Sequence, residues 1–122
     1  MGDVSQPTVP ATEPTTWYTL PDLAERFEVP VTRVRQMIRE RQLLAVRREG
    51  VLRVPGELVG TPTALKHLPG VLTLLHDAGY NDEEALRWLY TPDDTLPGGT
   101  PAATLGGPGA TEVKRRAQAV GF

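Results

Sequence analysis

The chain has no cysteine among its 122 residues. This absence excludes disulfide bonds, thiolate metal sites and a cysteine nucleophile, and it fits a reducing compartment. No apolar run approaches the roughly 18 residues of a membrane span. The start MGDVSQPT has neither the basic nor the hydrophobic segment of a secretory signal. We therefore expect a cytoplasmic protein with no membrane partner.

Residues suited to catalysis or metal binding are scarce as well. The only two histidines, His67 and His76, lie nine residues apart, which is not a metal-ligand spacing. The acidic run at 82–84 is explained by the start of a helix. The glycine pairs at 98–99 and 106–107 lack the lysine of a phosphate-binding loop. Because no nucleophile is paired with a base, we expect no catalytic residue, no metal, no cofactor and no enzymatic activity.

The small net charge conceals a basic block. The formal charge of the whole chain is −2. The segment from Arg26 to Arg53 contains eight arginines and three glutamates, a net of +5, so the rest of the chain carries −7. Such asymmetry indicates a polyanionic partner.

Composition divides the chain into three parts. Residues 1–16 contain three prolines and four threonines with almost nothing to bury, which predicts a disordered N-terminal tail. Residues 17–55 form one predicted domain, and residues 56–122 form a short helical C-terminal domain. The predicted fold class is mainly α with a small β-hairpin.

The segment 17–55 has the order helix, turn, helix, hairpin. Thr19 is a good N-cap for the first helix, and Asp22 lies where it can return a capping bond. Glu28-Val29-Pro30 forms the turn, and the second helix covers about Val31 to Gln42. Glu49-Gly50 lies between LAVRR and VLRVP, where glycine suits a tight hairpin. This order predicts a winged helix-turn-helix, which places its second helix in the DNA major groove.

The exposed residues of the second helix and the hairpin are the candidate contacts with double-stranded DNA. Side chains near the start of the second helix can reach base edges, whereas arginines of the hairpin suit phosphates. The predicted DNA-binding residues are Thr32, Arg33, Arg35, Gln36 and Arg39 on the helix, and Arg47, Arg48 and Arg53 on the hairpin. The alternative is a solvated charged surface without a ligand.

Several helices are predicted after the hairpin. Their ranges are Thr63–Leu68, Gly70–Asp77, Asn81 through Trp88 and Tyr90, a turn at Thr100–Leu105, and Thr111–Val120. The apolar residues expected inside are Leu72, Leu75, Leu86, Trp88 and Leu89. Because a unit of about 40 residues buries little surface alone, these helices should pack on the winged domain or on a second copy.

The segment YTLPDLAERFEVPVTRVRQMIRERQLLAVRREGVLRVP resembles excisionase/MerR-type winged helix-turn-helix domains, although Glu28 stands where many relatives have glycine. The whole chain resembles a family of small actinobacterial DNA-binding regulators known as substrates of the Ser/Thr protein kinase PknL. That resemblance implies a kinase partner and phosphorylation of the tail, with Thr8 and Thr12 as the nearest positions. The alternative for the tail is a plain linker.

The segment ALRWLYTPDDTLPGGTPAATL is similar to the toxin-binding domain of Xre/MbcA/ParS-type antitoxins, with Asp93 in place of the usual asparagine. This resemblance implies a homodimer or a protein partner bound through the C-terminal domain. The leading hypothesis is a DNA-binding transcriptional regulator controlled by phosphorylation of its tail. The alternative is an antitoxin-like protein-interaction module.

Overall fold

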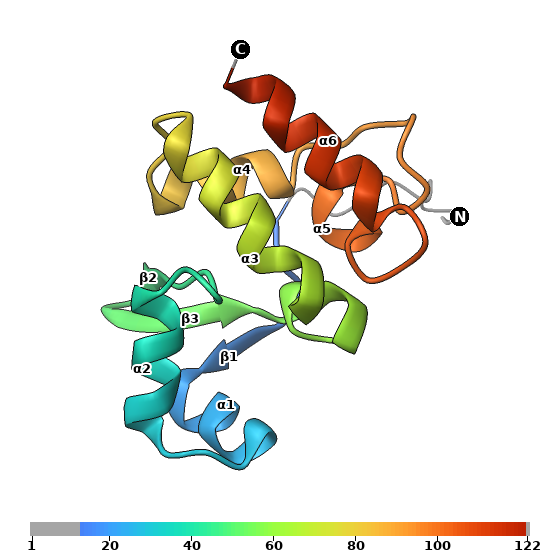
Figure 1. Ribbon diagram of the computed structural model, residues 1–122. Coiled ribbons are helices and arrows are strands. Elements are labelled where there is room, and N and C mark those ends of the chain that lie inside the picture. The colour runs from blue at the N-terminus through green and yellow to red at the C-terminus, as the bar shows by residue number, and fades with distance from the viewer. Residues whose placement is uncertain (1–12, 122) are drawn as a thin grey trace, which may run out of the picture.

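The computed structural model describes residues 13–121, shown in Figure 1. The elements are β1 (Trp17–Thr19), α1 (Leu20–Phe27), α2 (Val31–Arg39), β2 (Val46–Arg48), β3 (Val51–Pro55), the 3₁₀ turn η1 (Gly56–Leu58), α3 (Pro62–Asp77), α4 (Asp82–Leu89), α5 (Pro101–Thr104) and α6 (Ala110–Val120). A winged helix-turn-helix is thus followed by a helical C-terminal region, the fold class that the sequence predicted.

The sheet has three antiparallel strands in the order β1-β3-β2. The predicted hairpin is confirmed as β2 and β3, with Glu49 and Gly50 both at positive φ in its turn. The third strand, β1, was not expected. Three residues are too few to show an alternating pattern, and β1 exists because Tyr18 pairs with Val54 of β3.

The two faces of the sheet contribute to different hydrophobic clusters. Val54 packs with Leu23 of α1 and Val34 of α2 in one cluster. Val46 and Trp17 pack with the C-terminal helices in the other. Neighbouring residues of a strand point to opposite faces, so the sheet lies between the helix-turn-helix and the C-terminal region, as Figure 1 shows.

The start of α1 agrees with its sequence. The Thr19 side chain accepts from the Asp22 N–H, and Asp22 accepts from the Thr19 N–H in return. The helix ends where Glu28 adopts the left-handed conformation, with φ 58° and ψ 47°. The turn therefore has the geometry that glycine usually provides, although it is built with glutamate.

Helix α2 is shorter than predicted, since it ends at Arg39 rather than at Gln42. The reason is the left-handed φ of 58° at Arg41. This reversal lets the Gln42 N–H donate to Met37 O at 2.8 Å and the Arg41 N–H donate to Ile38 O at 3.1 Å. These bonds satisfy the last carbonyls of the helix and stop it.

The two helices predicted at Thr63–Leu68 and Gly70–Asp77 are one helix, α3, which continues through Pro69. The prediction of a break at Pro69-Gly70 was wrong. Burial on both sides of the proline overrides its helix-breaking tendency, because α3 packs along α6. The buried residues of α3 are Ala64, Leu68, Val71, Leu72 and Leu75.

Helix α4 begins with a capping box, in which Asn81 and Glu84 exchange side-chain to backbone hydrogen bonds. Leu86 and Leu89 are buried as predicted. Trp88 is only partly buried at the edge of the core, so its expected place inside was wrong. A two-turn helix can direct only one face inward, and Ala85, Leu86 and Leu89 occupy it.

The expected tail of residues 1–16 is attached to the body at its C-terminal end. Pro14 is buried, Thr16 O accepts from the Gly56 N–H at 2.8 Å, and the Thr15 hydroxyl donates to Glu57 at 2.8 Å. Thr8 and Thr12 lie outside the described residues. Within residues 13–121, every helix is too short or too polar to cross a membrane.

Candidate nucleic-acid interface

The outer face of α2 presents most of the residues predicted to touch DNA. Thr32, Arg35, Gln36 and Arg39 are exposed, and Arg33 is half-buried. Val34 is fully buried on the opposite side and fixes the rotation of the helix. The structure therefore groups five of the eight predicted DNA-binding residues on one face of a short, well-anchored helix.

Glu40, which was not among the predicted site residues, contacts two of them. Its carboxylate accepts from Gln36 Nε2 at 3.0 Å and lies 4.0 Å from Arg33 Nη1. Gln42 Nε2 donates to the same carboxylate at 3.2 Å. Glu40 therefore limits the conformations of Arg33 and Gln36, two of the predicted base-reading side chains. The i, i+4 spacing of Gln36 and Glu40 on a helix was a signal available in the sequence.

A groove joins α2 to the hairpin. Arg35 of α2 and Arg47 of β2 line the same cavity of ≈ 320 Å³, whose other walls are Leu20, Pro21, Gly50, Val51 and Leu52. Val51, at the hairpin tip, is 43% exposed. Two arginines from different elements therefore line one surface depression, an arrangement suited to a phosphate backbone.

The other two predicted hairpin arginines lie elsewhere. Arg48 follows Arg47 in β2 and points to the opposite face, where Nη1 and Nη2 donate to Glu83 of α4 at 2.7 and 3.1 Å. Arg53 Nη2 pairs with Glu49 at 3.3 Å. The Arg53 Nε is buried and has no hydrogen-bond partner in the described part of the chain. The structure does not bring Arg48 and Arg53 into the groove of Arg35 and Arg47.

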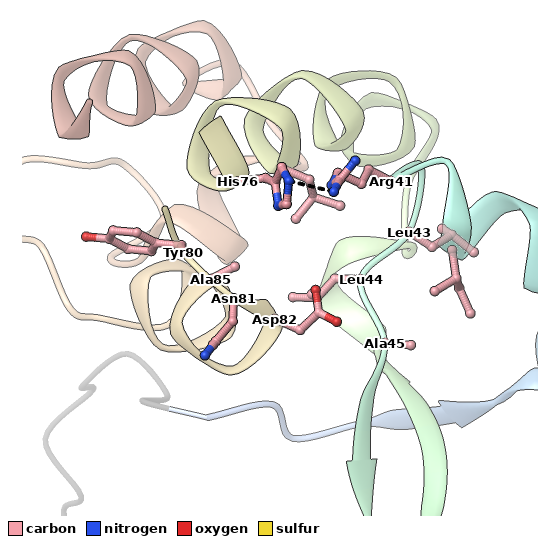
Figure 2. Close-up of a pocket in the computed structure, with 11 residues that line it drawn as sticks. Arg41, Leu43, Leu44, Ala45, His76, Tyr80, Asn81, Asp82 and Ala85 are labelled. Carbon is pink, nitrogen blue, oxygen red and sulfur yellow. Dashed lines mark hydrogen bonds between the residues drawn. The ribbon is translucent and has the colours of Figure 1, made fainter. Parts of the chain in front are cut away.

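Arg41, at the reversal after α2, is directed toward the C-terminal region. Its Nη2 lies 2.7 Å from Nε2 of His76 in α3, and Figure 2 shows the two side chains meeting at a cavity of ≈ 40 Å³. Arginine can only donate, so His76 Nε2 accepts in this contact. Arg41 is thus turned away from the exposed face of α2.

Glu57 joins the base of the tail to the C-terminal region. It accepts from the Tyr90 hydroxyl at 2.7 Å and from the Thr15 hydroxyl at 2.8 Å. Partial burial raises the pKa of Glu57, but these hydrogen bonds outweigh burial and the net pKa is lowered. Burial first, and then the bond to Glu57, raise the pKa of Tyr90. The pair therefore holds a charged carboxylate at the junction.

The fold, the basic face of α2 and the hairpin groove define a DNA-binding protein of the winged helix-turn-helix class. Residues 3–59 match the family model described as "DNA-binding protein Rv2175c, wHTH domain", and residues 65–121 match the one described as "Rv2175c C-terminal domain of unknown function". The chain belongs to the Rv2175c family.

Two similarities to Rv2175c, one in sequence and one in structure, support this assignment. The DNA-binding protein Rv2175c of Mycobacterium tuberculosis (strain ATCC 25618 / H37Rv) is 43% identical, over 90% of this chain and 82% of that protein. The NMR structure of Rv2175c superimposes with a TM-score of 0.76 at 39% identity, over 99% of this chain and 87% of that one.

Proposed function

We propose that this protein is a transcriptional regulator that binds a specific double-stranded DNA sequence through α2 and the hairpin. The observation that carries the proposal is the groove shared by Arg35 and Arg47 beside the exposed face of α2. In this arrangement Thr32, Arg33 and Gln36 meet base edges in the major groove. Arg35, Arg39 and Arg47 contact phosphates and set the register.

Salt dependence is the direct test of the proposal. If about five phosphates are neutralised, the logarithm of affinity should fall with the logarithm of salt concentration with a slope near −4.5. Binding-site selection with the full-length protein, followed by titration on the selected duplex, measures both sequence preference and slope. Absence of binding to duplex DNA at low salt, or a slope near zero, would contradict the proposal.

We further propose that phosphorylation of Thr8 or Thr12 by a Ser/Thr protein kinase weakens DNA binding. The support is the attachment of residues 13–16: Glu13, Pro14 and Trp17 border one cavity with Arg48 and Arg87. Glu13 and Pro14 therefore lie beside the hairpin, on the face of β2 that carries Arg48. A phosphate adds about −1.5 to −2 charges. It repels the phosphates of the duplex, and salt screens the effect.

The test compares unmodified protein, kinase-treated protein and a Thr8→Ala/Thr12→Ala variant on one duplex at low ionic strength. Treated wild type should bind more weakly than untreated protein, whereas the treated double variant should bind like untreated wild type. Equal affinities before and after treatment, with tail phosphate confirmed by mass spectrometry, would refute this mechanism.

A second candidate function is the binding of a protein partner, or of a second copy, through the C-terminal region. The supporting observation is Trp88, which is partly exposed between two cavities of ≈ 290 and ≈ 240 Å³. Tyr80 and Thr91 border the first, and Pro92 and Pro101 border the second. Partly exposed aromatic residues are common anchors of interfaces. Light scattering of wild type and Trp88→Ala, with and without DNA, tests self-association directly.

A further inference from the structure

The two adjacent hairpin arginines serve different surfaces. Arg47 borders the groove that it shares with Arg35 of α2. Arg48 is on the same face of β2 as Val46, which packs in the cluster of the C-terminal region. An extended strand cannot turn both side chains to the same side, so Arg48 cannot join Arg47 at a DNA backbone without deforming β2.

Arg48 is held on its own face by several contacts. Its two terminal nitrogens form a bidentate pair with Glu83, at 2.7 and 3.1 Å. Nη1 also donates to the Arg47 carbonyl at 2.8 Å, and the guanidinium lies 5.3 Å from the centre of the Trp17 ring. The bond to Arg48 lowers the pKa of Glu83, so the carboxylate is charged at neutral pH. Bidentate geometry and aromatic contact make the pair more specific than an ordinary surface ion pair.

Other contacts between the hairpin and the C-terminal region are fixed as well. Trp17, beside Arg48, belongs to β1, which is paired to β3. Close by, Tyr90 of the C-terminal region donates to Glu57, just after β3. The hairpin is therefore linked to the C-terminal region at two points. Arg48 of β2 binds Glu83 of α4, and Glu57, just after β3, binds Tyr90, the residue after α4. The tip of the hairpin, with Glu49, Gly50 and Val51, extends beyond these links.

We propose that Glu83 is a positioning residue for DNA binding: through Arg48 it holds the hairpin where Arg47 and Arg35 border one groove, and Arg48 itself contacts no phosphate. The proposal deepens the proposed DNA interface and rests on it. It assigns a role to the C-terminal region, whose matching family model is described as being of unknown function. The opposite possibility is that Glu83 masks Arg48 and that a DNA phosphate displaces the Glu83 carboxylate.

The two possibilities predict opposite signs for Glu83→Gln in the full-length protein. If Glu83 masks a phosphate-binding arginine, the substitution frees Arg48, tightens binding and steepens the salt slope. If Glu83 positions the hairpin, binding weakens, by about threefold for a surface ion pair, and the slope does not steepen. Asp94→Asn, which removes one negative charge from an exposed position in the loop after α4, is the matched control for net charge.

Two further variants identify the route of the effect. Arg48→Gln should weaken binding as much as Glu83→Gln does and should change the slope by the same amount, whereas Arg47→Ala should make the slope shallower by about 1. The double variant Glu83→Gln/Arg48→Gln should be no weaker than either single one, because both remove the same contact.

The decisive measurement is a cycle between Glu83→Gln and Arg47→Ala. Glu83 and Arg47 share no hydrogen bond. If Glu83 nevertheless places Arg47, the loss of DNA affinity caused by Arg47→Ala should be smaller in the Glu83→Gln variant than in the wild type. A general loss of stability would not produce this coupling, and thermal melts of each variant monitor folding separately. Unchanged or tighter binding by Glu83→Gln relative to Asp94→Asn, a slope for Arg48→Gln that is shallower than that of Glu83→Gln, or additive effects in the cycle would overturn the proposal. A wild type without salt-dependent binding would instead refute the DNA interface itself.

Discussion

Three non-glycine residues of the described chain have positive φ: Glu28, Arg41 and Glu49. Glu28 and Arg41 each reverse the chain directly after a helix of the helix-turn-helix, and Glu49 begins the hairpin turn. A left-handed residue with a Cβ costs roughly 1–2 kcal/mol. The surrounding helices, not the intrinsic preference of these residues, therefore maintain the turns.

Glu28→Gly should raise the free energy of unfolding by about 0.5–1 kcal/mol, because glycine relieves the left-handed strain but gains entropy in the unfolded chain. Urea denaturation measures the change. Glu25→Gly is the matched control: it makes the same chemical change inside α1 and should destabilise by about 1 kcal/mol. A loss of stability for Glu28→Gly would mean that the Glu28 side chain, rather than its backbone, determines the energy of the turn.

The base-reading and phosphate-contacting residues should separate by substitution. Arg33→Ala and Gln36→Ala should each reduce discrimination between the preferred duplex and single-base variants by about 1–3 kcal/mol. Arg47→Ala should weaken binding to every duplex by a similar factor. Titrations of one panel of duplexes measure both effects. If Arg47→Ala alone altered sequence preference, the proposed docking orientation would be wrong.

Among the elements, the hairpin shows most directly how turn chemistry supports the interface. Its turn combines Glu49 at φ 56° with Gly50 at φ 78°. Positive φ at both central residues matches the twist of the two strands and fixes the register in which Arg47 pairs with Leu52. The turn therefore determines which arginine borders the groove.

Gly50→Ala should destabilise the protein by about 1 kcal/mol through the backbone alone, because a Cβ at Gly50 would meet nothing within 4 Å. Gly107→Ala is the matched control: a Cβ there also meets nothing within 4 Å, and Gly107 is not among the positive-φ glycines. Chemical denaturation of both variants compares them. Equal stabilities would indicate that the hairpin turn relaxes without cost.

At the scale of the whole molecule, the two hydrophobic clusters depend on each other through the sheet. Val54 belongs to one cluster and Val46 to the other, although β2 and β3 are paired. Val59, beyond the hairpin, completes the cluster of the helix-turn-helix. The winged unit is thus not closed by its own residues.

A chain truncated after Pro55 should therefore fail to melt cooperatively, since it loses Val59 and exposes Val46 and Trp17. Circular dichroism with heating measures this. A chain that begins at Glu13 and keeps the C-terminal region is the control and should melt cooperatively. A sharp, reversible transition for the truncated chain would show that the winged unit folds alone.

Stability should also depend on pH through Glu57. Its pKa in the folded protein lies below the ordinary glutamate value of 4.5, because the hydrogen bonds to the carboxylate outweigh its partial burial. The stabilisation is therefore complete above that value and is lost as the pH falls through the folded pKa. Between about pH 5 and about pH 3, the wild type should lose more free energy of unfolding than Glu57→Gln. If the free energies of unfolding of the wild type and of Glu57→Gln fell in parallel with pH, Glu57 would contribute nothing to acid sensitivity.

Local sequence determined much of the winged helix-turn-helix and the start of α4. The Thr19–Asp22 capping box, the Asn81–Glu84 box and the Glu49-Gly50 turn depend on residues a few positions apart. Such interactions can be predicted from spacing alone. The basic block and the outward residues of α2 could be predicted for the same reason, since helical periodicity separates them from buried Val34.

Only the tertiary structure decided the rest. The pairing of β1 with β3 and the binding of Arg48 by Glu83 join residues that are distant in sequence. The continuity of α3 through Pro69 depends on burial against other elements. The identical side chains of Arg47 and Arg48 illustrate the difference. Sequence predicts that both are basic and lie on the hairpin. The two faces of β2 meet different partners, and this decides that Arg47 borders the groove of α2 and that Arg48 binds the C-terminal region.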